Sequence, residues 1–397
     1  ASCAAGIRYE GREDMAMVFT HSPAVSAGTY TTNVVKAAPV VWDRNITDND
    51  HAVYAVVVNS GIANACTGAE GDDACRRTAE AAAAALSAKR GVEASAENII
   101  LASTGVIGEK LPVEKFIAGS EEMAGCLDSS REAANRVARA IMTTDTVEKE
   151  VAVEFEVGGK TVTLGGMSKG SGMIHPNMCT MLAFLTTDVA ISKELLLKAL
   201  REDVKDTFNM ISVDGDTSTN DSLVILANGE SGAPLIDSEG PDYDAFREAL
   251  NFVNTTLAMK MAGDGEGATA LFEVKVTGAD TKENARTLAK SVITSSLTKA
   301  AIFGHDANWG RILCALGYSG VEFDPVKVTL DFESANGKIR IAQDGSGVNF
   351  SEEKATEILS CEKVTALVDM NTGDESATAW GCDLTYDYVK INADYRS

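Results

Sequence analysis

Apolar residues along the chain gather in short runs that are separated by polar or glycine-containing loops. Val53–Val58 is strongly apolar, and Asn98–Ala102 and Leu223–Ala227 are similar runs. Runs of this length between loops are typical of buried strands. After Ser192 the spacing changes, and apolar residues recur at every fourth position, as on one face of a helix: Leu196, Leu200, Val204 and Phe208.

The same patterns predict the other elements. Further strands are expected at Met17–Thr20, Gly28–Val35, Met181–Leu185, Ala270–Val276, Val326–Phe332, Lys338–Ala342 and Val364–Asp369, and a hairpin around Gly158-Gly159. Helices are expected at Asp73–Arg90, 113–142, Tyr243–Met261, from Asp280 through Leu297, and after Asn308. Residues 1–50 are otherwise expected to form short strands and turns. The uneven alternation predicts an α/β fold of the α+β type, with mixed β-sheets layered with helices.

The stretch Gly165–Asp188 changes from a glycine-rich polar half to an apolar half at Cys179–Thr180. Glycines allow the sharp bend by which a hydroxyl reaches the preceding carbonyl. A threonine that opens a buried strand behind such a loop is a candidate N-terminal nucleophile, with its own amine as base. The alternative is a glycine loop that leads into an ordinary core strand, and composition alone favours this alternative.

Other polar groups follow predicted strands. Thr104 and Gly105 come directly after Asn98–Ala102, where a hydroxyl and a backbone N–H can point at one spot as an oxyanion hole requires. A helix cap would explain the same residues equally well. Thr143, Thr144 and Asp145 form a polar cluster, and Glu266 stands in a glycine turn where most glutamates are simply exposed.

Composition narrows the class of protein. The formal net charge of −23 disfavours nucleic-acid binding, which needs clustered Lys and Arg. No apolar stretch is long enough for a membrane helix, and no signal-peptide pattern opens the chain. The eight cysteines form no Cys-x-x-Cys pair and the four histidines are dispersed, so no metal site is predicted. Scattered single cysteines predict reduced thiols and a cytoplasmic protein.

Eight motifs, in order, resemble the ornithine acetyltransferase family, also known as glutamate N-acetyltransferase. They are NSGIANACTG, STGVIG, IMTTDTVEK, KGSGMIHPNMCTMLAFLTTD, VDGDTSTNDS, GDGEGAT, NWGRI and DYVKINADYRS, and they extend over most of the chain. The chain departs from the family at a few positions. His175 and Cys179 stand where the family usually has alanine, Ala307 replaces a usual proline, and Ser397 a usual threonine.

The resemblance implies roles for particular residues. Self-cleavage between Cys179 and Thr180 would give an α chain, residues 1–179, and a β chain, residues 180–397, in an N-terminal-nucleophile-like sandwich. Thr180 would be the nucleophile, and Thr104 and Gly105 the oxyanion pair. The implied substrate-binding positions are Thr143, Lys169, Thr180, Glu266, Asn392 and Ser397. Lys169 and Glu266 offer counter-charges for the α-carboxylate and the side-chain ammonium of N-acetyl-L-ornithine.

The implied reaction is a ping-pong transfer of acetyl from N-acetyl-L-ornithine to L-glutamate, which gives ornithine and N-acetylglutamate in arginine biosynthesis. It needs no cofactor, although some members of the family take acetyl-CoA as a further donor. The α and β chains are expected to stay together as an α2β2 heterotetramer. Two other classes remain open on the residues alone: an N-terminal-nucleophile amidase or aminopeptidase, and an uncleaved non-catalytic binding protein.

Overall fold

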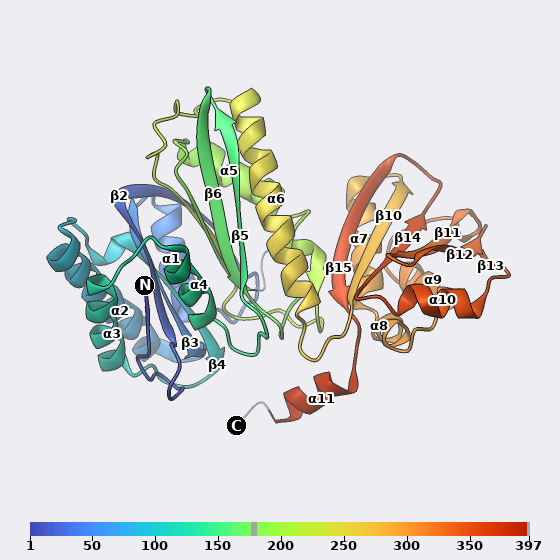
Figure 1. Ribbon diagram of the computed structural model, residues 1–397, viewed down its shortest axis with the longest axis horizontal. Coiled ribbons are helices and arrows are strands. Elements are labelled where there is room, and N and C mark those ends of the chain that lie inside the picture. Colours follow the sequence, from blue (N-terminus) through green and yellow to red (C-terminus); the bar gives the residue numbers. More distant parts are fainter. Residues whose placement is uncertain (176–180, 395–397) are drawn as a thin grey trace. The chain divides into compact units, whose positions relative to one another are not determined.

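The structure is a computed structural model, and it describes residues 1–175 and 181–394 of the 397-residue chain (Figure 1). The chain divides into two compact units. Unit 1 contains Ala1–Gly170, Thr217–Leu257 and the described residues of Pro176–Lys205. Unit 2 contains Ser171–His175, Asp206–Asp216 and the described residues of Ala258–Ser397.

One mixed sheet forms the centre of unit 1. Its strand order is β4-β3-β2-β9-β7-β6-β5, with β1 paired to β2. The β3–β4 and β7–β9 pairs are parallel and the others are antiparallel. The strands are β1 (Ser2–Cys3), β2 (Met15–Tyr30), β3 (Val53–Ile62), β4 (Ile99–Val106), β5 (Lys149–Val157), β6 (Lys160–Lys169), β7 (Leu182–Thr187) and β9 (Ser222–Ala227). The hairpin predicted around Gly158-Gly159 is confirmed as β5 and β6.

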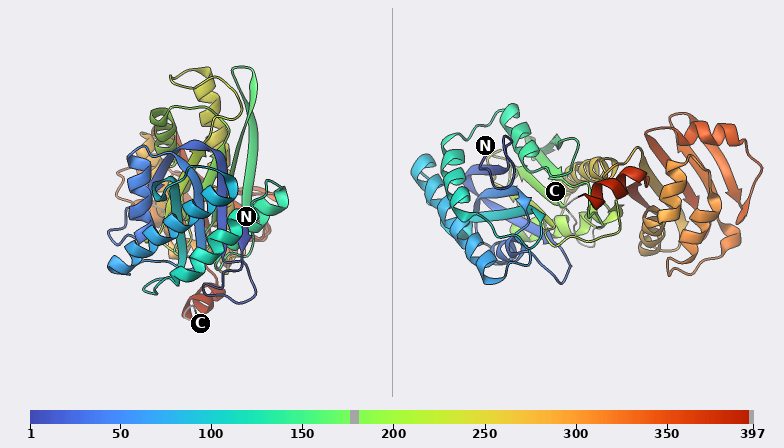
Figure 2. Two further views of the ribbon diagram at one scale, coloured as in Figure 1. Left: turned by 90° about the vertical axis from the view of Figure 1, so that its left-hand side faces the viewer. Right: turned by 90° about the horizontal axis from the view of Figure 1, so that it is seen from below.

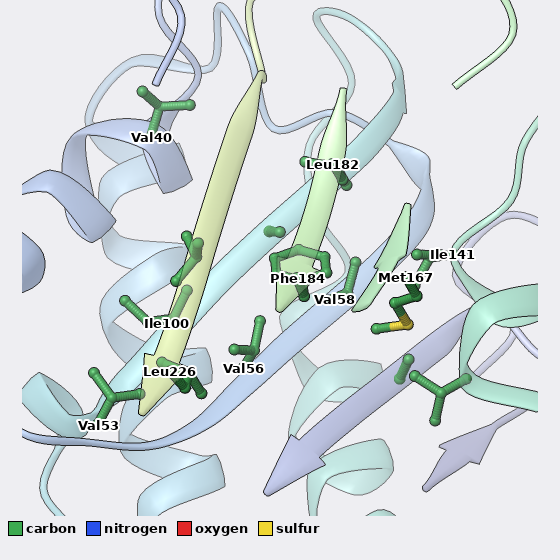
Figure 3. Close-up of a cluster of buried hydrophobic side chains, with 14 of the residues drawn as sticks. Val40, Val53, Val56, Val58, Ile100, Ile141, Met167, Leu182, Phe184 and Leu226 are labelled. Atoms are coloured by element: carbon green, nitrogen blue, oxygen red, sulfur yellow. The ribbon is translucent and has the colours of Figure 1, made fainter. Parts of the chain in front are cut away.

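Both faces of β3 are buried, each in a different core. Val56 and Val58 lie with Phe184 in one cluster, which α1 and α4 also help to form (Figure 3). Val57 belongs to a second cluster, which includes residues of α2 and α3 (Figures 1 and 2). A strand that is covered on both faces needs apolar residues at every position, not at every second one. This explains why Val53–Val58 is a continuous apolar run.

Two predictions for unit 1 are wrong in detail. The helices are α1 (Ala38–Asp48), α2 (Gly68–Arg90), α3 (Val113–Gly125), α4 (Arg131–Ala140), α5 (Lys193–Asp203) and α6 (Pro241–Gly263), of which α6 extends past Leu257 into unit 2. Residues 1–50 contain the 16-residue strand β2 and the helix α1 where short strands and turns were expected. Residues 113–142 form two helices, because Ser130 begins a new one by accepting the Ala133 N–H.

Unit 2 contains a second mixed sheet, in the order β13-β12-β11-β14-β10-β15-β8. Its strands are β8 (Ile211–Ser212), β10 (Leu271–Ala279), β11 (Thr329–Ser334), β12 (Gly337–Gln343), β13 (Ser346–Gly347), β14 (Lys363–Asp369) and β15 (Glu375–Cys382). Its helices are α7 (Lys282–Thr294), α8 (Ser296–Phe303), α9 (Trp309–Gly317), α10 (Glu352–Leu359) and α11 (Tyr386–Ala393). The prediction of mixed sheets with helices is therefore confirmed in both units.

The helix expected from Asp280 through Leu297 is also corrected. Thr281, not Asp280, is the N-cap of α7, because its hydroxyl accepts the Asn284 N–H. The helix ends at Thr294, and Ser295 then caps α8 by accepting the Thr298 N–H. A second capping residue inside a helical pattern interrupts the helix even where the apolar spacing continues. Asn308 caps α9 as predicted, since its side chain accepts the Arg311 N–H.

The predicted chain boundary at Cys179–Thr180 does not coincide with the division between the compact units. Strands β7 and β9, which follow that position in the sequence, lie between β2 and β6, which precede it. The division into residues 1–179 and 180–397 stays a prediction, because Cys179 and Thr180 lie outside the described residues. Within the residues that the structure covers, no helix is long and apolar enough to cross a membrane.

Candidate functional site

Three of the predicted site residues meet in unit 1 around the ammonium group of Lys169. Lys169 is the last residue of β6, and its Nζ lies 3.2 Å from Thr104 Oγ1 and 2.9 Å from Thr143 Oγ1. Because an ammonium group only donates, both hydroxyl oxygens act as acceptors and their protons are directed elsewhere. The side chain of Lys169 is only 9% exposed. Lys169 is thus buried, in contrast to the exposed position that is usual for a lysine.

Asp145 holds this group of residues in place. One carboxylate oxygen accepts the Gly170 N–H at 2.6 Å and the Lys149 ammonium at 2.8 Å. The other accepts the Thr143 N–H at 3.1 Å and lies 3.8 Å from Lys169 Nζ. Burial alone would raise the pKa of Asp145, but the two lysines and the Gly170 N–H outweigh burial and lower this pKa to about 2. Asp145 is therefore a buried anion at neutral pH.

Gly105 adopts a conformation that only glycine fits. Its φ is +132°, and a Cβ on it would lie 2.2 Å from the carbonyl carbon of Gly61. Gly61 and Gly105 are paired at the point where the register between β3 and β4 shifts. The close approach of the two backbones there explains why a glycine follows Thr104.

Asn220 fixes the end of β4 from another direction. Its side-chain amide donates to Ala63 O at 2.6 Å and to Ser103 O at 2.7 Å, and so joins the segments that follow β3 and precede Thr104. Asn220 belongs to the motif VDGDTSTNDS, in which no position was predicted as a site residue. A contact that spans more than 100 residues of sequence leaves no local pattern from which it could be read.

Glu266 and Asn392 meet in unit 2. Asn392, on α11, donates its amide N–H to Glu266 Oε2 at 2.8 Å. The Glu266 backbone N–H donates to Ser171 O at 2.9 Å, and a Cβ on Gly172 would lie 2.4 Å from the Glu266 carboxylate. Glu266 is buried, in contrast to the exposed position that is usual for a glutamate. Both residues are predicted to bind substrate, and this contact joins them in unit 2.

Asp214 anchors the chain just before the predicted cleavage position. Its carboxylate accepts the N–H groups of Met173 at 2.6 Å and Ile174 at 2.9 Å. His175 lies with Nδ1 3.1 Å from Ser212 Oγ, and burial lowers the pKa of its imidazole to about 4. The imidazole is therefore neutral at physiological pH. Neither Asp214 nor Ser212 was among the predicted site residues.

The predicted site residues thus fall into two groups and a remainder. Thr104, Gly105, Thr143 and Lys169 belong to unit 1, and Glu266 and Asn392 belong to unit 2. Cys179, Thr180 and Ser397 lie outside the described residues. Among the residues described, no group of three or more His, Cys, Asp or Glu could hold a metal ion.

A threonine and a glycine at one strand end, beside a buried lysine, suit an enzyme of the acyltransferase class. The chain belongs to the ArgJ family, whose model matches residues 1–397. It is 52% identical over 394 residues to the arginine biosynthesis bifunctional protein ArgJ 1 of Clostridium acetobutylicum, covering 99% of this chain and 94% of that protein. It is 48% identical over 387 residues to the ArgJ protein of Thermotoga neapolitana, covering 97% and 95%.

A solved structure agrees with these relatives. It is the arginine biosynthesis bifunctional protein argJ of Bacillus halodurans, with a TM-score of 0.51 and 44% identity, covering 53% of this chain and 97% of that chain. The family predicted from eight motifs is therefore confirmed, as is the prediction of an acyltransferase of arginine biosynthesis. The amidase and the non-catalytic binding protein are set aside.

Proposed function

We propose that this protein transfers acetyl from N-acetyl-L-ornithine to L-glutamate through an acetyl ester on Thr180. The Thr180 hydroxyl attacks the acetyl carbonyl, the C–N bond breaks, and ornithine leaves with a proton on its amine. The amine of glutamate then attacks the ester and restores the hydroxyl. The α-amine of Thr180 would move the protons, since its reference pKa of about 7.7–8.0 suits a base near neutral pH.

The observation that carries this proposal is the 3.2 Å contact between Lys169 Nζ and Thr104 Oγ1. In an N-acetyl amino acid the α-carboxylate and the acetyl carbonyl are only a few bonds apart. A group that binds the carboxylate must therefore lie close to the group that stabilises the oxyanion. Lys169 supplies the charge for the carboxylate, and Thr104 and the Gly105 backbone supply the oxyanion hole. Thr143 belongs to the same hydrogen-bonded group.

Glu266 and Asn392 are assigned to the side-chain ammonium of ornithine. Glu266 is a buried carboxylate whose Oε2 already accepts one N–H from Asn392. A carboxylate has further acceptor sites on each oxygen, so an ammonium group can still bind to it. Ser397 completes the proposed set of substrate-binding residues on the strength of the family resemblance alone.

Thr180 becomes a nucleophile in this scheme only after self-cleavage. Its hydroxyl attacks the Cys179 carbonyl, an N-to-O acyl shift gives an ester, and water opens the ester. The half-length chain of the Bacillus halodurans structure supports this step, because 97% of that chain matches only 53% of the present one. Intact mass of the purified protein should show fragments 1–179 and 180–397, and Thr180→Ala should leave one chain. A single full-length mass for the unmutated protein after long incubation would refute the scheme.

The two fragments are proposed to remain associated, and two such pairs to form an α2β2 heterotetramer. Fragment association is supported by the sheet of unit 1, in which β7 and β9 lie between β2 and β6. The proposal that two such pairs form the heterotetramer rests on the family resemblance. Size-exclusion chromatography with light scattering should give twice the mass of one pair of fragments, and the mass of a single pair would show the heterotetramer to be wrong.

A second activity is proposed from the names of the relatives, which are called bifunctional. Acetyl-CoA would then serve as an additional acetyl donor to the same threonine, as a substrate and not as a bound cofactor. The purified protein should form N-acetylglutamate from acetyl-CoA and glutamate without N-acetylornithine. If N-acetylglutamate forms from N-acetylornithine and glutamate but not from acetyl-CoA and glutamate, the protein has only the first activity.

A further inference from the structure

Two buried lysines share one buried aspartate at the open end of the β5–β6 hairpin. Lys149 is the first residue of β5 and Lys169 the last of β6, and Lys149 is paired with Ser168, the neighbour of Lys169. Asp145 lies 2.8 Å from Lys149 and 3.8 Å from Lys169. The side chains of Lys149 and Asp145 are both 0% exposed. The proposed function uses Lys169 but gives Lys149 no role.

A fully buried lysine is costly, because its ammonium group loses the hydration that stabilises its charge. Lys149 recovers part of this cost from Asp145 and from Val147 O, which accepts a hydrogen bond at 3.2 Å. A structural pair would need only one lysine and one aspartate. The third charge, Lys169, lies beside the same carboxylate and gives the three side chains together a charge of +1.

We propose that Lys149 is a positioning residue that takes up the charge of Asp145, so that Lys169 keeps a positive charge for the substrate carboxylate. Asp145 is needed for geometry, since it also holds the N–H groups of Gly170 and Thr143. Next to Lys169 alone, however, this carboxylate would compete with the substrate for the same ammonium group. Lys149, the closer of the two cations, prevents that competition by neutralising the aspartate locally.

This inference rests on the proposed function, because it assumes that Lys169 binds the α-carboxylate. Both amino-acid substrates carry that group, so a change in the charge of the cluster should alter binding of both alike. Uniform effects on binding appear in KM, with kcat much less affected. A merely structural pair predicts no such selectivity for KM and no dependence on the charge of the substrate.

The experiment compares Lys149→Met, Asp145→Asn with Lys149→Met, and Lys169→Met with the unmutated enzyme. Lys149→Met makes the cluster neutral, and KM for both N-acetylornithine and glutamate should rise by about 10- to 100-fold, the loss expected for one charge-assisted hydrogen bond. The double variant restores a charge of +1 with Lys169 as its source. Its KM should fall well below that of Lys149→Met but not to the unmutated value, because asparagine offers one acceptor oxygen to the Gly170 and Thr143 N–H groups where aspartate offers two.

A substrate without the charge provides the second readout. N-acetyl-L-ornithinamide has a carboxamide in place of the α-carboxylate, and its KM should be the same with Lys149→Met as with the unmutated enzyme. Asp43→Asn is the matched control, because Asp43 is a buried aspartate of unit 1 that accepts the Leu101 N–H outside the cluster. Its KM values should not change.

The possible outcomes separate the two proposals. If Lys169→Met leaves KM unchanged, Lys169 does not bind the carboxylate and the proposed role fails. If Lys169→Met raises KM but Lys149→Met does not, the role of Lys149 fails by itself. A double variant as impaired in KM as Lys149→Met would also overturn it. Should Lys149→Met not yield folded protein, the double variant decides the question, because it removes both charges of the buried pair together.

Discussion

Replacing Gly172 by alanine should weaken the recognition of N-acetylornithine by Glu266 without unfolding the protein. A Cβ at this position would lie 2.4 Å from Cδ, Oε1 and Oε2 of Glu266. Carbon and oxygen atoms in ordinary contact lie about 3.5 Å apart, so the carboxylate must move by roughly 1 Å. The hydrogen bond to Asn392 is 2.8 Å long, and such bonds are limited to about 3.2 Å. A shift of that size is enough to break this bond.

The substitution is expected to lower the catalytic rate and to leave the protein folded. Misplacing a binding group by about 1 Å can cost about 10²-fold in rate, so kcat/KM for N-acetylornithine should fall by ~10- to 100-fold. The φ of Gly172 is not in the positive range, so alanine brings no backbone strain. The atoms it meets are the far end of a flexible side chain. The free energy of unfolding should fall by no more than about 1.5–3 kcal/mol, the contribution of one hydrogen bond to a charged group, and the loss of backbone freedom in the unfolded chain offsets part of that.

The assay is ornithine release from N-acetylornithine, with urea unfolding and intact mass measured on the same preparation. Gly240→Ala is the matched control, because nothing lies within 4 Å of a Cβ at Gly240 and its φ is not positive either. Normal ornithine release by Gly172→Ala would refute the assignment of Glu266 to the ornithine ammonium. A loss of activity that matches an equal loss of stability would show that the segment is only structural.

Three further predictions concern the same groups. Thr104→Ala removes a donor to the developing oxyanion and should lower kcat by about 10²–10³-fold with little change in KM; a rise in KM alone would make Thr104 a binding residue. Glu266→Gln should lower kcat/KM for N-acetylornithine by ~10- to 100-fold and that for glutamate much less, and equal losses in the two half-reactions would argue that Glu266 orients the loop instead. Asp145 has a native pKa of about 2, below its reference value of 3.8, so the stability it contributes is present at neutral pH and is lost as the pH falls through this interval. The advantage of the unmutated protein over Asp145→Asn in unfolding free energy should shrink by about 1 kcal/mol between pH 5 and pH 3, and a constant difference would contradict the native ion pair.

Many of the strands could be predicted from the sequence, because burial on one or both faces leaves apolar runs, but β1, β8, β13 and β15 were not among them. Val53–Val58 was predicted as a strand, and β3 continues to Ile62. The next three residues, Asn59, Ser60 and Gly61, are polar or glycine and so predict a loop, yet they continue the ladder with β4. Composition alone does not show where pairing between strands ends.

The helix α1 was missed because its buried face contains a carboxylate. Asp43 is fully buried and accepts the Leu101 N–H at 2.8 Å, so it occupies a core position where the helical pattern requires an apolar residue. No side chain caps the start of this helix, and Pro39 in its first turn is the only starting signal of the usual kind. A buried acid whose partner lies 58 residues away can be recognised only in the folded protein.

The candidate site shows the same limit. The family resemblance identified Lys169 and Thr104, but no pattern in the sequence places them 3.2 Å apart. Lys149 was not among the predicted site residues, and lysines are mostly exposed in folded proteins. The structure buries it against Asp145. Which charges lie together is decided by the pairing of β5 with β6, and thus by contacts across many residues.

The strand order of unit 1 also governs when the proposed cut could occur during synthesis. A chain that has emerged only as far as Thr187 contains β7 but lacks β9, the parallel neighbour that joins β7 to β2. β7 can pair with β6 at that stage, but its other neighbour is missing until Ala227 has left the ribosome, so the sheet of unit 1 is still incomplete. Self-cleavage at Cys179–Thr180 would then be postponed until the sheet is complete. The order of the strands would thus delay cleavage of the nascent chain until its two halves are bound to each other.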